Sequence, residues 1–218
     1  DMLSQNVEAI VCNDPAVTSS LKAVFRERNF DYADKVRLYE GQYDMLDAFG
    51  VTDEVDRLLE HKVKLRSGVS LVFDYTEALT VIDVNTSGFA RGSNHEETVF
   101  RANLDAAREI ARQIRLRNIG GIIVIDFIDM TEEEHKAAVV EELRREMIFD
   151  RTKTRVIGMS SLGLVEVTRK KVGREISTVL LDRCPFCNGD AHAQSVDYVA
   201  RKIKVGLKRL FADNRNKT

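Results

Sequence analysis

Two short apolar segments of this chain each end on an aspartate, at Asp83 and at Asp126. Asn85 lies two positions after the first of them. A carboxylate at the end of a buried apolar run is costly unless it is paired or binds a metal, and Mg²⁺ prefers hard oxygen ligands. These residue types therefore favour a divalent-metal site. For either aspartate taken alone, a cap on the following loop or helix is an equally good interpretation.

The positions of the two aspartates depend on the fold of residues 78–130. Residues 78–84 and 120–126 are rich in β-branched residues, as is typical of strands, and the segment between them has the 3.6-residue period of a helix. A strand–helix–strand crossover makes its two strands parallel. We therefore expect Asp83 and Asp126 at the same end of one sheet, the end where open α/β sheets bind ligands.

The rest of the chain supplies the other elements of a mixed α/β fold. Thr131 and Glu134 have the spacing of a capping box, and Thr52 or Asp53 is expected to cap an earlier helix. A turn-like Arg66 makes a domain boundary near it plausible. We expect strands over residues 7–12, 35–38, 69–74, 154–159 and 163–168, and helices over residues 14–28, 51–59, 96–117, 131–149 and 193–211.

Cys184 and Cys187 form a C-x-x-C pair whose two thiolates can bind one zinc ion. Zinc needs four ligands, and the third cysteine of the chain, Cys12, stands alone. His192 is near enough to be a further ligand, although a histidine there is more often incidental. Two chains of a symmetric dimer can also share one zinc through four cysteines. A redox pair is the remaining alternative, but Asn188-Gly189 would interrupt the helix that it requires.

A row of arginines lies on one face of the helix expected over residues 96–117, opposite its apolar face. Asp105 and Glu109 are interspersed with them, which favours a solvated face with ion pairs. The alternative is a surface that contacts phosphates. The arginines are Arg101, Arg108, Arg112 and Arg115.

Composition limits the classes of protein to which the chain can belong. A hydrophobic content of 44% and a charged content of 31% fit a soluble globular protein, and no apolar run has the length of a membrane span. The net charge of −2 leaves only local patches for nucleic-acid binding. Three cysteines do not suggest a disulfide framework, and no signal peptide is visible, so we expect a cytoplasmic protein. Because residue 1 is Asp1, we expect a piece of a longer chain.

Several of these segments together resemble the ribonuclease E/G family of bacterial endoribonucleases. The resemblance is strong over residues 39–189. It is carried by TEALT at 76–80, IDVN at 82–85, EET at 96–98, NL at 103–104, EIARQIRLR at 109–117, GGIIVIDFIDM at 120–130, DR at 150–151 and the CPxCxG motif at 184–189.

The resemblance implies a domain organisation. The N-terminal RNA-binding OB-fold and the 5′-end-sensing subdomain of the family are missing, so the chain resembles a fragment of the catalytic core. The family's zinc motif usually continues Gly-Thr-Gly, whereas Asp190 follows Gly189 here. The expected parts are an RNase H-like remnant at residues 1–65, a DNase I-like catalytic subdomain with a mixed sheet at 66–179, a zinc-link at 180–192 and a helical small-domain segment at 193–218.

The resemblance also implies roles for the residues of the first site. Asp83 and Asp126 match the two aspartates that hold the catalytic Mg²⁺, and Asn85 matches the residue that hydrogen-bonds the scissile phosphate. The implied substrate is single-stranded RNA rich in A and U, which is cleaved to 5′-phosphate and 3′-hydroxyl products in RNA processing and decay.

Further roles concern partners. Cys184 and Cys187 match the cysteines that share Zn²⁺ between two chains, which implies a homodimer and in some members a tetramer. Lys153 stands where an arginine usually contacts RNA, so the charge is kept but the bidentate geometry is lost. With Arg112 and Arg115 it forms our set of candidate RNA contacts. The alternative functions are a non-catalytic RNA-binding fragment and a zinc-linked dimerisation module.

Overall fold

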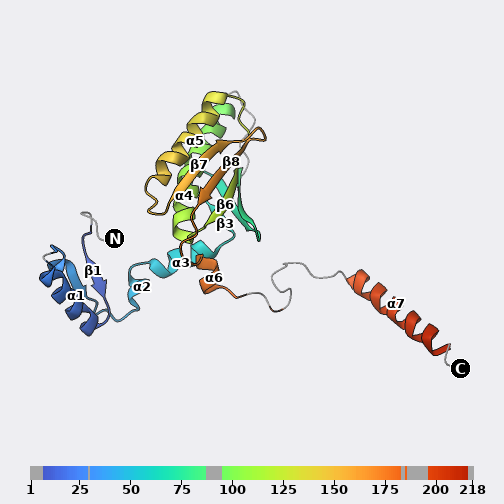
Figure 1. Cartoon of the computed structure of the whole chain (residues 1–218), viewed down its shortest axis with the longest axis horizontal. Coiled ribbons are helices and arrows are strands. Elements are labelled where there is room, and N and C mark those ends of the chain that lie inside the picture. The colour runs from blue at the N-terminus through green and yellow to red at the C-terminus, as the bar shows by residue number, and fades with distance from the viewer. Residues whose placement is uncertain (1–6, 29, 87–94, 183–184, 186–195, 216–218) are drawn as a thin grey trace. The chain divides into compact units, whose positions relative to one another are not determined.

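The computed structural model describes residues 7–28, 30–86, 95–182, 185 and 196–215 (Figure 1). The chain divides into two compact units, Asp1–Ile176 and Ser177–Thr218. The subdomain boundaries expected near residues 65, 179 and 192 stay predictions, whereas the mixed α/β class is confirmed by the helices and the two sheets of the described residues.

The first elements form a small parallel pair of strands with a crossover helix. Asp14 caps this helix, because its Oδ1 accepts hydrogen bonds from the backbone N–H groups of Ala16 and Val17 at 2.7 and 2.9 Å. Phe25, Ala33 and Val36 form the buried core of the pair. The elements are β1 (Ile10–Cys12), α1 (Pro15–Glu27), the 3₁₀ turn η1 (Ala33–Lys35) and β2 (Val36–Leu38). The two strands and α1 were predicted, with β1 shorter than expected, whereas η1 was not.

Two helical segments follow, α2 (Met45–Ala48) and α3 (Val51–Leu59). The predicted cap of α3 at Thr52 or Asp53 was wrong. Gly50 precedes α3 with φ of 67°, a left-handed conformation that glycine adopts without strain. The Thr52 hydroxyl instead donates to Asp47, within the preceding α2.

A six-stranded sheet, ordered β3-β4-β5-β6-β8-β7, is the centre of the first unit. β5 and β6 pair in parallel, and every other pair of neighbours is antiparallel. All the predicted strands of this sheet are present, and only the three-residue β3 was not foreseen. The strands are β3 (Lys62–Lys64), β4 (Val69–Tyr75), β5 (Leu79–Thr86), β6 (Gly121–Asp126), β7 (Thr154–Met159) and β8 (Leu164–Arg169).

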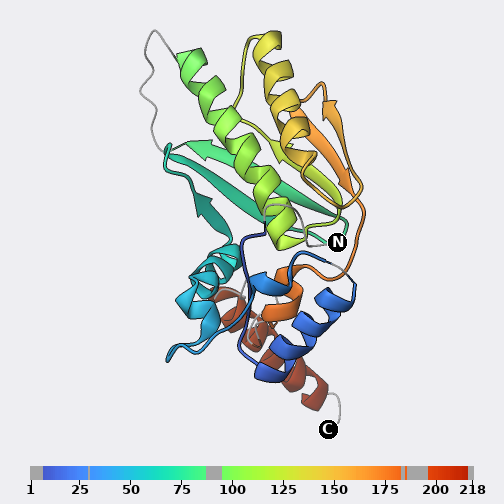
Figure 2. The same cartoon turned by 90° about the vertical axis from the view of Figure 1, so that its left-hand side faces the viewer.

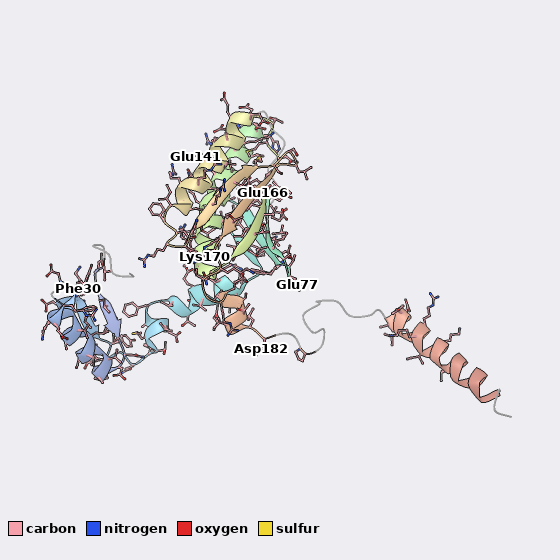
Figure 3. The ribbon with its side chains drawn as sticks, viewed as in Figure 1. Phe30, Glu77, Glu141, Glu166, Lys170 and Asp182 are labelled. Carbon is pink, nitrogen blue, oxygen red and sulfur yellow. The ribbon has the colours of Figure 1, made fainter. Side chains whose placement is uncertain are left out.

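Helices α4 (His95–Arg117) and α5 (Glu133–Met147) lie side by side on one face of this sheet (Figure 2). Alternate residues of the strands, such as Ile82 and Ile125, are fully buried beneath them. The intervening residues point to the opposite face, where Glu166 of β8 is exposed (Figure 3). Asp83 and Asp126 belong to this second set, which we call the open face.

Two glycines, Gly120 and Gly121, stand at the start of β6 for a steric reason. A Cβ atom on Gly120 would stand 3.1 Å from the Cα atom of Lys171, and Gly121 has φ of 100°. The segment that follows β8 therefore passes too close to the start of β6 for a larger residue.

A buried ion pair joins the ends of several elements at the edge where β6 begins. Arg169 on β8 donates to Asp150 through Nε at 2.7 Å and Nη2 at 3.2 Å, and both side chains are nearly inaccessible. The same guanidinium donates to the backbone oxygen of Ile119 and to Asn118, which follow α4. Burial raises the pKa of Asp150, but hydrogen bonds from Arg169, Thr152 and Thr154 outweigh it and hold the pKa below its ordinary value.

The second unit contains most of α6 (Ile176–Leu180) and all of α7 (Val196–Arg215). The final helix was expected over residues 193–211; residues 193–195 lie outside the described residues, and the helix continues to Arg215, beyond the predicted end. Val196, Val199 and Ile203 are exposed along one stripe of α7. Among the described residues, no helix has both the length and the apolar character needed to cross a membrane.

Candidate active site

Asp83 and Asp126 are register partners on β5 and β6. Asp126 is the last residue of β6, and Asp83 is the last residue of β5 that pairs with it, although β5 continues to Thr86. Both point to the open face because their strand neighbours Ile82 and Ile125 point to the core. Neighbouring strands lie about 4.8 Å apart, so the two carboxylates share one small region of the surface. The crossover prediction is confirmed in this respect.

Asn85 lies on the same face as Asp83, as residues two apart on a strand do. Its Nδ2 donates a hydrogen bond to Oδ2 of Asp83. The residue is exposed, so its amide is accessible from solvent beside the aspartate pair. The structure thus brings together the three residues that the sequence analysis grouped.

The carboxylates of this edge repel one another. Burial raises the pKa of Asp126, and the charges of Asp83 and Asp129 raise it further. Within the described part of the chain, no lysine or arginine forms an ion pair with any of the three. Converging oxygen ligands without a protein cation suit a divalent metal ion. No cluster of three or more metal-ligating side chains is present among the residues that the structure describes.

The segment after Asp126 is held by a buried amide of α4. Asn103 Nδ2 donates to the backbone oxygen of Ile128 at 2.8 Å, and the Ile128 N–H donates to Asn103 Oδ1 at 3.1 Å. Asn103 is fully buried. The sequence analysis quoted it only within the NL motif and gave it no role, although a polar residue on the apolar face of an amphipathic helix was a usable signal.

Glu96, in the first turn of α4, holds the start of α5. Its carboxylate accepts from the Thr131 N–H at 3.2 Å, the Thr131 hydroxyl at 2.8 Å and the Glu132 N–H at 3.3 Å, and His135 Nδ1 lies 3.1 Å away. Hydrogen bonds from Thr131 are the largest cause that lowers the pKa of Glu96 to about 2. The predicted capping box of Thr131 and Glu134 was wrong, because Glu132 is the N-cap position and makes no side-chain cap.

The candidate RNA contacts lie toward the opposite ends of the strands from the aspartates, where β6 begins. Arg112 and Arg115 are near the end of α4, from which the chain returns to the start of β6. Lys153 precedes β7, and its backbone oxygen accepts from Lys170, next to the register partner of Gly121. The length of β6 therefore separates these three residues from the aspartates, roughly 17 Å at about 3.3 Å per residue.

The arginines of α4 are held by protein partners. Arg112 pairs with Glu109 at 3.0 Å and with Glu54 at 3.3 Å, and Arg115 donates to the backbone oxygen of Glu146 at 2.8 Å. Arg101 and Arg108 likewise pair with acidic residues. These contacts support the solvated-face interpretation of the row, and RNA binding by Arg112, Arg115 and Lys153 stays a prediction.

The zinc expectation lies outside the described residues. Cys184, Cys187 and His192 all belong to segments that the structure does not describe.

The family model described as "Ribonuclease E/G family" matches residues 1–172 of the chain. This chain belongs to the ribonuclease E/G family. It is 46% identical over 169 residues to ribonuclease G of Escherichia coli (strain K12), which covers 78% of this chain and 35% of that protein. It is 38% identical over 211 residues to ribonuclease G of Haemophilus influenzae, covering 97% of this chain and 43% of that protein.

A third relative is a ribonuclease E and not a ribonuclease G. Ribonuclease E of Escherichia coli (strain K12) is 38% identical over 193 residues, which is 87% of this chain but 18% of that protein. The chain therefore spans less than half the length of each of these relatives. The membership confirms the resemblance that the motifs of residues 76–130 carry.

Proposed function

We propose that this chain is the catalytic part of a Mg²⁺-dependent endoribonuclease. The observation that carries the proposal is the register pairing of Asp83 and Asp126 at the carboxyl edge of parallel strands. Family membership supports it. The coarser inference, an endoribonuclease role in RNA processing and decay, rests on the printed names of the relatives. The metal, the substrate and the products rest on the residues and on the family resemblance.

In this proposal Asp83 and Asp126 hold the metal ion. Mg²⁺ keeps several water ligands and requires oxygen donors, which the two carboxylates and an RNA phosphate can supply. When bound, such an ion polarises a phosphodiester and lowers the pKa of a coordinated water. Asn85 orients Asp83 through its present hydrogen bond and donates to a non-bridging oxygen of the scissile phosphate. The products are a 5′-phosphate and a 3′-hydroxyl, from single-stranded RNA rich in A and U.

The predicted RNA contacts then serve a part of the substrate away from the scissile bond. Lys153 is exposed and lies near the start of β6, whereas the aspartates lie at its end. RNA that contacts both must extend along the strand direction for about 17 Å. Lys153 contacts phosphates as a point charge. Arg112 and Arg115 join it only if RNA displaces or shares their present acidic and carbonyl partners.

The proposal includes a second copy of this chain as a partner. Cys184 and Cys187 hold one Zn²⁺ together with the same residues of a second chain, which gives a zinc-linked homodimer and a possible tetramer in the cytoplasm. Metal analysis of the purified protein tests this part. A zinc content near one half per chain supports a shared site, and one zinc per chain contradicts it.

A nuclease assay decides the main proposal. Short single-stranded RNA is incubated with the protein and Mg²⁺, with and without chelator, and the ends of the products are analysed. Chelator-sensitive cleavage that leaves 5′-phosphates supports the proposal. Tight RNA binding without any cleavage would favour the second candidate, a non-catalytic RNA-binding or dimerisation fragment.

A further inference from the structure

Two side chains of α4 hold the backbone that leads from Asp126 into α5. Asn103 binds both the N–H and the carbonyl of Ile128. Seven residues earlier, on the same side of the helix, Glu96 binds the N–H groups of Thr131 and Glu132. The loop between these points carries Asp129, and Asp126 stands just before it.

Residues 127–132 belong to no helix or strand, so their backbone N–H and C=O groups need hydrogen-bond partners outside regular secondary structure, such as side chains. A single amide that binds both sides of one residue fixes the orientation of two successive peptide planes. Ile128 is two residues after Asp126 and one before Asp129, so the directions of both aspartates depend on these planes. Glu96 adds a second fixed point five residues after Asp126, where α5 begins.

We propose that Asn103 and Glu96 are positioning residues, which set the geometry of Asp126 and Asp129 and thereby the affinity of this edge for a divalent cation. The inference rests on the proposed function, since it takes the edge to be a metal site. Mg²⁺ and Mn²⁺ sites tolerate little displacement of their oxygen ligands. Residues that orient metal ligands change metal affinity by about 10–100-fold when they are mutated.

The alternative is that Asn103 only stabilises the fold, and α4 contains a matched control for it. Gln113 is also buried, at 4% exposure against 0% for Asn103, and its amide also makes two hydrogen bonds, to Glu109 and from Arg117. It lies toward the other end of the helix, away from the carboxylates. Asn103→Leu and Gln113→Leu therefore remove the same kind of group, but only the first releases Ile128.

The experiment measures Mn²⁺ binding to the full chain without RNA, by the loss of the free-ion signal in electron paramagnetic resonance. We expect Asn103→Leu to raise the Kd by about 10–100-fold and Gln113→Leu to leave it unchanged, while both lower the melting temperature. Equal Kd values for wild type and Asn103→Leu would overturn the proposal. An equal rise in both variants would also overturn it, because the effect would then follow stability alone.

Glu96 gives a second variant that does not open the core, so the proposal stays testable if Asn103→Leu fails to fold. Glu96→Gln should raise the Mn²⁺ Kd by about 10-fold. Glu97→Gln is its control for charge, since Glu97 is on the same turn but pairs with Arg101. A rise of equal size in Glu97→Gln would show that lost negative charge, and not position, explains the effect.

The failure of the proposed function has a different signature. Asp83→Asn and Asp126→Asn must each weaken Mn²⁺ binding if the edge is a metal site at all. If they do not, the metal assignment fails before the roles of Asn103 and Glu96 are reached. If they do, and Asn103→Leu and Glu96→Gln match their controls, only the positioning inference fails.

Discussion

Asp83 and Asp126 are paired residue against residue on the two parallel strands of a sheet whose other neighbours are antiparallel. The pairing sets two like charges side by side, and it contributes to the raised pKa of Asp126. Such an arrangement is unfavourable unless a cation resides between the carboxylates. We therefore expect the two aspartates to bind a metal ion that RNA cleavage requires.

Asp83→Asn and Asp126→Asn should each reduce RNA cleavage while the fold stays intact. Loss of an orienting residue alone costs metal sites about 10–100-fold, so loss of a ligand should cost about 100-fold or more. Initial cleavage rates with Mg²⁺ measure this, and circular dichroism checks the fold. Asp74→Asn is the matched control, because Asp74 is on neighbouring β4 but bonds to His61. Wild-type rates in either site variant would refute the metal assignment.

Asp150→Asn should destabilise the protein strongly. The substitution leaves the buried guanidinium of Arg169 without its counter-charge, and breaking such a pair costs about 3–5 kcal/mol. Urea denaturation followed by circular dichroism measures the change. Glu133→Gln is the comparison, because the pair of Glu133 with Lys136 is exposed and such pairs contribute about 0–1 kcal/mol. Similar losses in both variants would contradict the structural role of the buried pair.

Glu96 should make stability depend on acid pH. Its pKa falls from 4.5 to about 2 on folding, so the folded state favours the ionised form. The stabilisation is fully present above pH 4.5 and is lost as the pH falls toward about 2. His135 Nδ1 faces the same carboxylate, and its Nε2 lies 3.4 Å from Glu132.

The measurement compares wild type with Glu96→Gln by urea denaturation at several pH values. The stability difference between the two should be largest above pH 4.5 and should shrink as the pH is lowered below it. Glu97→Gln, which removes a carboxylate on the same turn that pairs with Arg101, is the matched control. A difference that is constant with pH, or that grows in acid, would show that the Glu96 contacts do not depend on its charge.

Lys153→Gln should weaken RNA binding in a salt-dependent manner. A lost phosphate contact lowers the slope of log K against log salt by about 0.7 on single strands. Arg112→Gln should change the slope less, because Glu109 and Glu54 already neutralise that guanidinium. Anisotropy of labelled RNA, measured in an Asp126→Asn background to prevent cleavage, gives both slopes. Unchanged slopes in both variants would remove these residues from the RNA contacts.

Local patterns were sufficient for the scaffold of the site. The periods of residues 78–84, 96–117 and 120–126 predicted β5, α4 and β6, because hydrophobic periodicity reports which face of an element is buried. The crossover rule then predicted that Asp83 and Asp126 would share an edge, since a helix that connects two neighbouring strands makes them parallel. Asp14 was likewise recognisable as the start of α1, because a cap acts within its own turn.

The residues that hold the site depended on the tertiary structure. Thr131 and Glu134 have the spacing of a capping box, yet Glu96 binds Thr131 from another helix, 35 residues away. Asn103 and Ile128 are 25 residues apart in the sequence and meet only because α4 packs beside the segment that follows β6. Arg112 forms an ion pair with Glu54, which is 58 residues away in the sequence. The arginine row that was ambiguous in the sequence is therefore held by ion pairs and, at Arg115, by a backbone oxygen.

The sequence by itself therefore determined the elements and the edge at which the two aspartates meet. The tertiary structure decided which side chains fix that edge and which charges are already paired. The physical reason is the distance along the chain over which each kind of interaction acts. Periodicity and capping act over a few residues along one element, whereas hydrogen bonds and ion pairs between elements depend on which faces the packing of distant residues brings together.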